Sequence, residues 1–425
     1  MTTEPLSRLP QCDLVIVLPH LGPGGAQKVA LLAADHFLAA GLKVVLVTLL
    51  PDKPRTHQLP DALDWIDLGD AVAAGRSNRA FIARAGRFTR VWTRRLIAWL
   101  IIGLGWPWLQ TIRPGQQAAL VQWLLISLSG PQAALLQALL SEIRPPRVLS
   151  LLTKTNLLCC QALWDLPGRL VVSERNDPRL QRLQFPWALL QSWLWQRADG
   201  ITANTSGVLT GLQACYPDQA SAMQLLPNPL VVEGLDGSSM PCSAGSSGGF
   251  LAVCRLVPQK GIDLLIRAYA LLPQALRAIW PLTIAGDGPE RHRLEQLADA
   301  LLLRDKVRFL GFQANPQPLY RDAAVFVLPS RFEGMPNALL EAMGHGLAVI
   351  VTDASPGPLE VVMDGQSGLV VPSEEVEALA LAMQRLAERA DLRQRLGVAA
   401  QVVTQQQSWT NLDACWRSVL GLVES

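Results

Sequence analysis

Several features that would place this sequence in a common functional class are missing from it. The seven cysteines include no Cys-x-x-Cys pair, and no histidine lies at a metal-ligand spacing from any of them, so a structural zinc site is not expected. The polar start has no basic segment followed by an apolar core, so no secretory signal is expected. Together these features predict reduced, mostly buried thiols in a cytoplasmic protein. The formal net charge of +2 argues against a dedicated nucleic-acid binder.

Two familiar nucleotide-binding motifs are also incomplete or absent. The loop GPGGAQ has Gln27 at the position of the third glycine of Gly-x-Gly-x-x-Gly, and the loop GDGPER has Arg291 there. A hydride-transferring dinucleotide enzyme is therefore poorly supported. The sequence also contains no Gly-x-x-x-x-Gly-Lys-Ser/Thr motif, which excludes a P-loop NTPase.

What the sequence does contain is a repeated α/β pattern. Half of its 425 residues are hydrophobic, which is enough for two large cores. A continuous apolar run at 13–21 is followed by a glycine loop, a helix pattern and a second run at 42–50, which predicts a βαβ unit. The same alternation begins again at 250–256 and continues to 347–353. We therefore expect an α/β fold with two Rossmann-like, doubly wound domains that face a cleft.

The predicted domain boundaries follow changes in composition along the chain. The first domain should cover residues 1–232, and a stretch rich in Gly and Ser at 233–249 should form a linker. The second domain should cover residues 250–405. A terminal helix at 406–425 could pack on either domain, including back on the first. A segment at about 71–141 interrupts the α/β pattern and is expected to be an insertion in the first domain.

This insertion has an unusual composition. It contains no Asp or Glu, but eight arginines and five of the thirteen tryptophans. The apolar run at 96–112 is interrupted by Gly103, Gly105 and Pro107, so a membrane-spanning helix is not favoured. Arginines followed by a tryptophan-rich apolar segment are typical of an element that lies at a membrane surface, which predicts peripheral contact with an anionic membrane. The alternative is a pair of core helices with a solvated basic face.

Two glutamates lie eight residues apart in the stretch RFEGMPNALLEAMGHGLAVIVTD. Pro336 suits the first turn of a helix, so Glu333 should lie in the entry loop and Glu341 on the helix itself. Carboxylates accept charge-assisted hydrogen bonds from vicinal hydroxyls. One acid for a hexose and one for a ribose therefore fits this spacing better than an acid/base couple. Either acid alone would more simply belong to a solvated helix end.

Two cations and two glycines complete the set of candidate ligand-binding residues. Arg255 ends a predicted strand, and Lys260 immediately precedes a predicted helix. Cations beside a helix N-terminus can bind a diphosphate and neutralise charge on a nucleoside-diphosphate leaving group. Either one alone would be an ordinary surface residue. Gly24 and Gly25 lie between a strand and a helix, where bare N–H groups can approach an anion or simply close a tight turn.

A set of motifs occurs in order along the chain. GGAQKV opens the first domain, and the second domain contains VCRLVPQKGIDLLIRA, LTIAGDGPE, VRFLGF, LPSRFEGMPNALLEAMGHGLAVIVTD and GQSGLVV. Together they resemble the group 1 (family 4) retaining glycosyltransferases of the GT-B fold. The resemblance implies that Glu333 contacts the donor sugar and Glu341 the ribose. It also implies that Arg255 and Lys260 bind the diphosphate and that Gly25 lies near the acceptor side of the phosphates.

Glu333, Arg255 and Lys260 are thus the expected catalytic residues. Further substrate-binding positions are expected at Gly24, Gly286, Gly334, Met335, Pro336, Asn337 and Ala338. The implied activity is transfer, with retention of configuration, of a hexose or N-acetylhexosamine from a nucleotide-diphosphate sugar, with UDP as the expected nucleotide. The implied acceptor is a lipid-linked sugar or a polysaccharide. No metal or other cofactor is expected, and the predicted location is the inner face of the plasma membrane.

The sequence departs from the family pattern at one place. Many relatives carry a histidine in the first domain near the anomeric carbon of the donor, but SERNDP follows the strand RLVVSE in this chain. Arg175 or Asn176 is the candidate to fill that space. Two other functions stay open from the sequence: a nucleotide-sugar epimerase, which needs no acceptor, and a non-catalytic partner that binds sugar nucleotides. The presence of all four charged residues weighs against the second.

Overall fold

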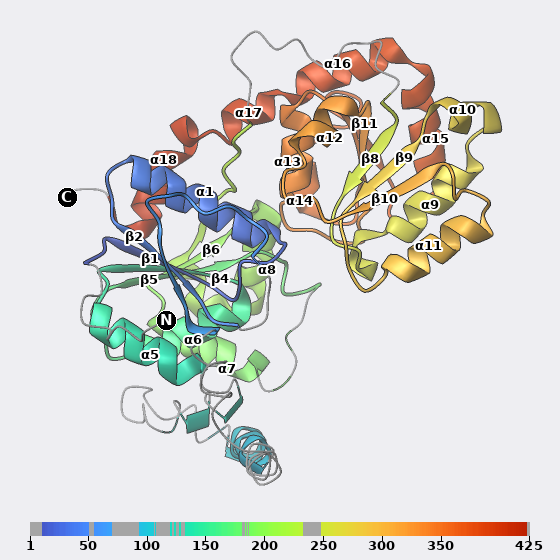
Figure 1. The fold of residues 1–425 in the computed structure, drawn as a ribbon. Coiled ribbons are helices and arrows are strands. Elements are labelled where there is room, and N and C mark those ends of the chain that lie inside the picture. Colours follow the sequence, from blue (N-terminus) through green and yellow to red (C-terminus); the bar gives the residue numbers. More distant parts are fainter. Residues whose placement is uncertain are drawn as a thin grey trace, which may run out of the picture.

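Two α/β domains make up the computed structural model, each built on a parallel sheet (Figure 1). This confirms the doubly wound fold that the sequence predicts. The structure describes residues 11–50, 55–69, 93–105, 107, 120, 123–124, 127–128, 132–180, 183, 185, 187–232 and 248–422.

The first sheet has the strand order β3-β2-β1-β4-β5-β6-β7, and all its neighbouring strands are parallel. The order reverses between β1 and β4, which is the doubly wound topology. The strands are β1 (Leu14–Leu18), β2 (Val44–Thr48), β3 (Asp64–Asp67), β4 (Arg147–Leu151), β5 (Arg169–Glu174), β6 (Gly200–Ala203) and β7 (Met223–Leu225). The described helices include α1 (Gly25–Ala39), α5 (Gln132–Ile143), α6 (Thr153–Ala162), α7 (Trp187–Leu194), α8 (Ser206–Cys215) and two 3-10 turns, Trp195–Arg197 and Pro217–Ala222.

Burial on both faces explains the continuous apolar runs of the central strands. In β1, Val15 and Val17 belong to the core that includes residues of α5, α6 and α7. Leu14, Ile16 and Leu18 belong to the core on the other face, with residues of α1 and the last helix. A strand covered on both sides needs apolar residues at every position, because successive side chains point to opposite faces. The edge strand β3, DWID, is largely exposed and carries two aspartates, so the sequence does not predict it.

The second sheet has the order β10-β9-β8-β11-β12-β13 and repeats the same topology with six strands. The strands are β8 (Phe250–Val253), β9 (Leu282–Ala285), β10 (Val307–Gly311), β11 (Val325–Leu328), β12 (Ala348–Thr352) and β13 (Leu369–Val371). The helices are α9 (Ile262–Leu271), α10 (Gln274–Ile279), α11 (Arg291–Ala300), α12 (Gln317–Asp322), α13 (Asn337–Gly344), α14 (Pro356–Leu359), α15 (Val376–Glu388), α16 (Ala390–Ala400) and α17 (Val402–Gln406), with a 3-10 turn at Pro258–Lys260.

The terminal helix α18 (Trp409–Leu420) packs on the first domain, beside α1 (Figure 1). Trp416 is fully buried there, and its indole N–H donates to the carbonyl of Pro227 at 3.2 Å. His36 of α1 stacks on Trp409 with a centroid distance of 3.9 Å and lies 2.7 Å from the carboxylate of Asp413. The chain therefore crosses from the second domain back to the first, so the domains are connected twice.

Most of the predicted insertion, and residues 233–247 of the predicted linker, lie outside the described residues. Within the insertion, residues 93–105 form a helix with two different faces. Ala98 and Ile102 are fully buried in the core of the first domain. On the other face, Leu96, Ile97, Trp99, Leu100 and Leu104 are 42–82% exposed. Within the described part of the chain, no helix is both long and apolar enough to cross a membrane.

Six of the seven cysteines are described, and all six are free thiols. Cys159 and Cys160 are buried on α6, and burial raises the pKa of Cys159 to about 12, so its thiolate is strongly disfavoured. The prediction of mostly buried thiols is wrong for the remaining described ones. Cys12, Cys254 and Cys415 are partly exposed and Cys215 is exposed.

Candidate functional site

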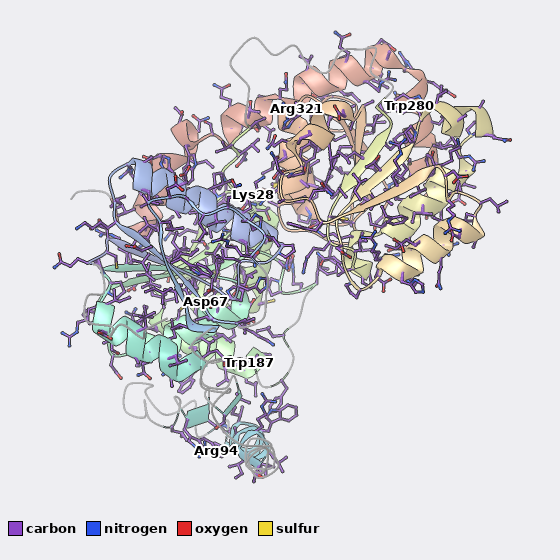
Figure 2. The ribbon with its side chains drawn as sticks, viewed as in Figure 1. Lys28, Asp67, Arg94, Trp187, Trp280 and Arg321 are labelled. Atoms are coloured by element: carbon purple, nitrogen blue, oxygen red, sulfur yellow. The ribbon has the colours of Figure 1, made fainter. Side chains whose placement is uncertain are left out.

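Several contacts between the two domains come from segments that follow the carboxyl ends of strands. In the first domain, Lys28 of α1 follows β1, and Figure 2 labels it at the end of α1 nearest the second domain. In the second, Glu341 of α13 follows β11. A second contact joins α8 to the end of α14, where Ser206 Oγ donates to Glu360 Oε1 at 2.7 Å. Ligands of open α/β sheets bind at this edge, so the domain junction is the candidate site.

Glu333 and Lys260 form an ion pair in the second domain. Glu333 is 7% exposed in the loop between β11 and α13, and its Oε1 lies 2.5 Å from Lys260 Nζ. Ser330 Oγ donates to the same oxygen at 2.7 Å, and the Glu333 N–H donates to Ser355 Oγ at 2.8 Å. The structure therefore brings a predicted sugar-binding acid and a predicted diphosphate-binding cation into direct contact. Oε2 of Glu333 has no hydrogen bond within the described residues, so it can still accept one.

A glycine is required directly after Lys260. Gly261 has φ +62, and a Cβ at this position would lie 2.0 Å from the carbonyl oxygen of Pro329. Only glycine combines a left-handed conformation with this close approach of two backbones. The tight turn holds Lys260 beside the loop that carries Glu333, although the two residues are 73 positions apart.

Glu341 is held by a residue that the sequence analysis did not select. Glu341 lies on the second turn of α13, as predicted from the helix pattern, and is 4% exposed. Lys28 Nζ reaches across from the first domain and lies 2.7 Å from Glu341 Oε1. The sequence feature that could have indicated a role for Lys28 is its place in GGAQKV, three residues after Gly25 and one helical turn into α1. Nothing local could reveal a partner 313 residues away.

Arg255 and Gly286 lie at the ends of β8 and β9. The Arg255 side chain is exposed and makes no hydrogen bond or ion pair with any described residue, so it is free to contact a ligand. Gly286 has φ +143, and a Cβ there would lie 1.7 Å from the carbonyl oxygen of Cys254. Gly286 thus lets the two strand ends approach closely beside Arg255.

The start of α13 touches the first domain through its backbone and through Asn337. Asn337 Nδ2 donates to the carbonyl of Gly25 at 3.0 Å. A Cβ on Gly334 would lie 2.0 Å from the carbonyl oxygen of Arg175, so this contact also requires glycine. Pro336 is the N-cap of α13. The side chains of Met335 and Ala338 pack instead into the apolar core of the second domain.

Arg175 lies at the end of β5 and is 8% exposed. Burial lowers its pKa to about 10, which leaves it charged at neutral pH. Its Nη1 donates to Asn228 Oδ1, a residue that the sequence analysis also missed. Asn176 follows and is partly buried. The structure thus places the backbone of Arg175 at the domain junction, against Gly334.

Glu174 is a buried acid directly beside this site. It is 5% exposed at the end of β5 and accepts hydrogen bonds from Thr153 Oγ1 at 2.6 Å and Asn156 Nδ2 at 2.9 Å. Burial raises the pKa of Glu174 to about 7, against the stabilising effect of these two hydrogen bonds. The folded protein therefore holds a proton on Glu174 in a pH range where the unfolded chain has lost it.

Replacement of Glu174 by glutamine should change the pH dependence of stability. Since the folded pKa is about 7 and the unfolded one about 4.5, this group lowers the free energy of unfolding as pH rises between these values. Glu174→Gln removes this dependence, so its stability relative to wild type should increase by up to about 3 kcal/mol from pH 5 to pH 8. Urea unfolding at several pH values measures this difference. Glu377→Gln, an exposed acid on α15, is the control, and a difference that does not vary with pH would contradict the prediction.

Comparison with known proteins identifies the family. The model of "Glycosyl transferases group 1" matches residues 247–403. A Campylobacter jejuni N-acetylgalactosaminyltransferase that acts on an undecaprenol diphosphate-linked sugar is 30% identical over 248 residues, which are 57% of this chain and 67% of that protein. The chain belongs to the group 1 glycosyltransferases. Membership supports a transferase rather than a nucleotide-sugar epimerase.

Alignments of this glycosyltransferase with other proteins cover different shares of those proteins. An exopolysaccharide phosphotransferase of Streptomyces coelicolor is 40% identical over 239 residues, which are 56% of this chain but only 25% of that protein. Among solved structures, Anabaena HepE in complex with UDP and glucose has a TM-score of 0.70 at 17% identity, covering 96% of this chain and 99% of HepE. Sucrose-phosphate synthase of Thermosynechococcus elongatus has a TM-score of 0.68 at 17% identity, with the same coverage of 96% and 99%. These structures confirm the GT-B fold.

Proposed function

We propose that this glycosyltransferase moves a hexose or N-acetylhexosamine from a UDP-sugar to a lipid-linked or polysaccharide acceptor in cell-surface glycan synthesis. The observation that carries the proposal is the arrangement around the start of α13. Glu333 pairs with Lys260, Glu341 pairs with Lys28 of the first domain, and Asn337 contacts the glycine loop. The Campylobacter relative, which is named for transfer to an undecaprenol diphosphate-linked sugar, supports a lipid-linked acceptor. HepE, solved with UDP and glucose, supports UDP as the nucleotide.

In the proposed reaction, the bond between the anomeric carbon and the diphosphate breaks on the face where the acceptor oxygen attacks, so the configuration is retained. The acceptor's proton passes to the leaving diphosphate. Arg255 and Lys260 stabilise the negative charge that grows on this group without a metal. Glu333 accepts a hydrogen bond from a hydroxyl of the donor sugar, and Glu341 accepts from the ribose. The N–H groups that follow Gly24 face the same charge from the first domain.

A screen of nucleotide sugars tests this proposal. A ligand that binds only the folded state raises its stability with concentration, so one UDP-sugar should raise the melting temperature progressively while most GDP-sugars do not. The same donor should release UDP when a lipid-linked sugar or a polysaccharide fragment is added. A change in the sugar's configuration with donor alone would indicate an epimerase instead. The absence of any stabilising nucleotide sugar would refute the proposal.

We also propose that the enzyme works as a peripheral protein on the inner face of the plasma membrane, through the helix at 93–105. Its exposed face carries Leu96, Leu100 and Leu104 in a row at four-residue spacing. Arg94 is exposed on the same helix, and the surrounding insertion has no acidic residue. Figure 2 places Arg94 at the end of the first domain that is remote from the second domain. An apolar row beside arginines fits an anionic lipid surface.

Substitution of two leucines on this face should weaken binding to lipid. Leu100→Ser with Leu104→Ser should lower partitioning to vesicles that contain anionic lipid by about 100-fold or more, because each leucine contributes about 1.5–3 kcal/mol when buried. Sedimentation with vesicles measures the bound fraction, and higher salt should also reduce it. Leu381→Ser, a 68% exposed leucine on α15, is the matched control. Equal binding of the double variant and wild type would rule out this surface.

A further inference from the structure

Asn228 lies in the segment that leads from β7 toward the second domain. Its side chain is 3% exposed, and both of its polar atoms are used. Oδ1 accepts from Arg175 Nη1 at the end of β5. Nδ2 donates to the carbonyl of Met335 at 3.2 Å and to Asn337 Oδ1 at 2.6 Å. One amide therefore joins the first domain to the loop before α13.

The hydrogen bonds continue from Asn337 to the glycine loop. Asn337 Nδ2 donates to the carbonyl of Gly25 at 3.0 Å. The resulting chain runs from Arg175 through Asn228 and Asn337 to Gly25, and it connects three segments that contain expected substrate-binding residues. Only one orientation of each amide satisfies it, because a guanidinium can only donate and a carbonyl can only accept. This chain of hydrogen bonds therefore depends on the amide groups of both Asn228 and Asn337.

Arg175 has further capacity to bind a ligand. Its Nε and Nη2 atoms are buried and have no partner among the described residues. Buried donors without a partner are rare because they lose their hydrogen bonds to water. Asn204 lies nearby with its Oδ1 also buried and unpaired, and a Cβ on Gly334 would be 3.1 Å from that oxygen. Unpaired donors and an unpaired acceptor beside the Gly334 loop indicate a place for a polar ligand group.

We propose that Asn228 is a positioning residue for sugar transfer, an inference that rests on the proposed function above. It orients the guanidinium of Arg175 and the amide of Asn337, and through Asn337 it fixes the glycine loop relative to α13. Arg255, Lys260 and Glu341 hold the nucleotide within the second domain without help from Asn228. Loss of Asn228 therefore affects the alignment of donor and acceptor far more than the binding of the nucleotide.

The test compares UDP binding with turnover in Asn228→Ala. The dissociation constant of UDP should change less than about twofold, while kcat should fall about 100-fold, as expected for a misplacement of about 1 Å. Asn228→Asp keeps the volume but turns a donor into an acceptor that faces two oxygens, so its kcat should fall as well. Asn411→Ala, an exposed asparagine on α18, is the control.

A double-mutant cycle with Asn337→Ala separates positioning from general stability. If the two asparagines act through the same chain of hydrogen bonds, the double variant should lose no more activity than the worse single variant. Additive losses, an unchanged kcat in Asn228→Ala, or a UDP affinity that falls in parallel with kcat would each overturn the proposal. Wild-type protein that transfers no sugar would instead refute the proposed function itself.

Discussion

Lys260→Ala is expected to lower the rate of sugar transfer by about 100- to 1,000-fold, the effect of removing one preorganised group that stabilises charge in a transition state. Two effects act in the same direction. The leaving diphosphate loses a cation, and Glu333, which is 7% exposed, loses the partner that balances its buried charge. The measurement is kcat for transfer from the donor found in the screen. Lys306→Ala, an exposed lysine with no ion pair to any described residue, should keep the wild-type rate.

Glu333→Ala should reduce kcat to a similar extent. Because Lys260 and Glu333 form one ion pair, the losses should not add, and the double variant should resemble the worse single variant. Thermal unfolding of each variant shows whether a lower kcat reflects lost catalysis or a smaller folded fraction. If both single variants transfer sugar at the wild-type rate, neither residue has the proposed role.

Gly334→Ala is the second substitution with a large expected effect. The added Cβ would lie 2.0 Å from the carbonyl oxygen of Arg175, a backbone atom that cannot rotate away. The loop before α13 must then move away from the first domain, which shifts Glu333 and pulls Asn337 away from Gly25. We expect kcat to fall by about 100-fold or more. The contact lies between domains, so the melting temperature should change little.

A second alanine provides the matched control for Gly334→Ala. Gly200 on β6 is buried, but its nearest neighbour to a new Cβ is 3.6 Å away, an ordinary van der Waals distance. Gly200→Ala should therefore retain transfer activity, measured as sugar incorporated into acceptor over time. Gly334→Ala with full activity would show that the two domains need not approach as closely as they do in this structure.

The ion pairs of the candidate site could not be predicted from the sequence, because their partners meet only in the three-dimensional structure. The sequence alone indicated Glu333 and Lys260 as separate ligands for a sugar and a diphosphate, and the structure pairs them with each other. Lys28 and Asn228 could not be selected, because each finds its partners more than 50 residues away along the chain. Glu174 looked like the end of an ordinary strand, and only its burial raises its pKa.

The sequence by itself determined what depends on short-range patterns. Continuous apolar runs predicted the central strands, and the proline at 336 placed one glutamate before α13 and the other on it. Tertiary structure alone decided which domain holds α18 and which strands form the edges, since short or polar segments such as β3 have no pattern of their own. It also decided the pairing of charges across the junction. Local spacing fixes the direction in which a side chain leaves its own element, whereas contacts between domains depend on how two separately formed cores pack together.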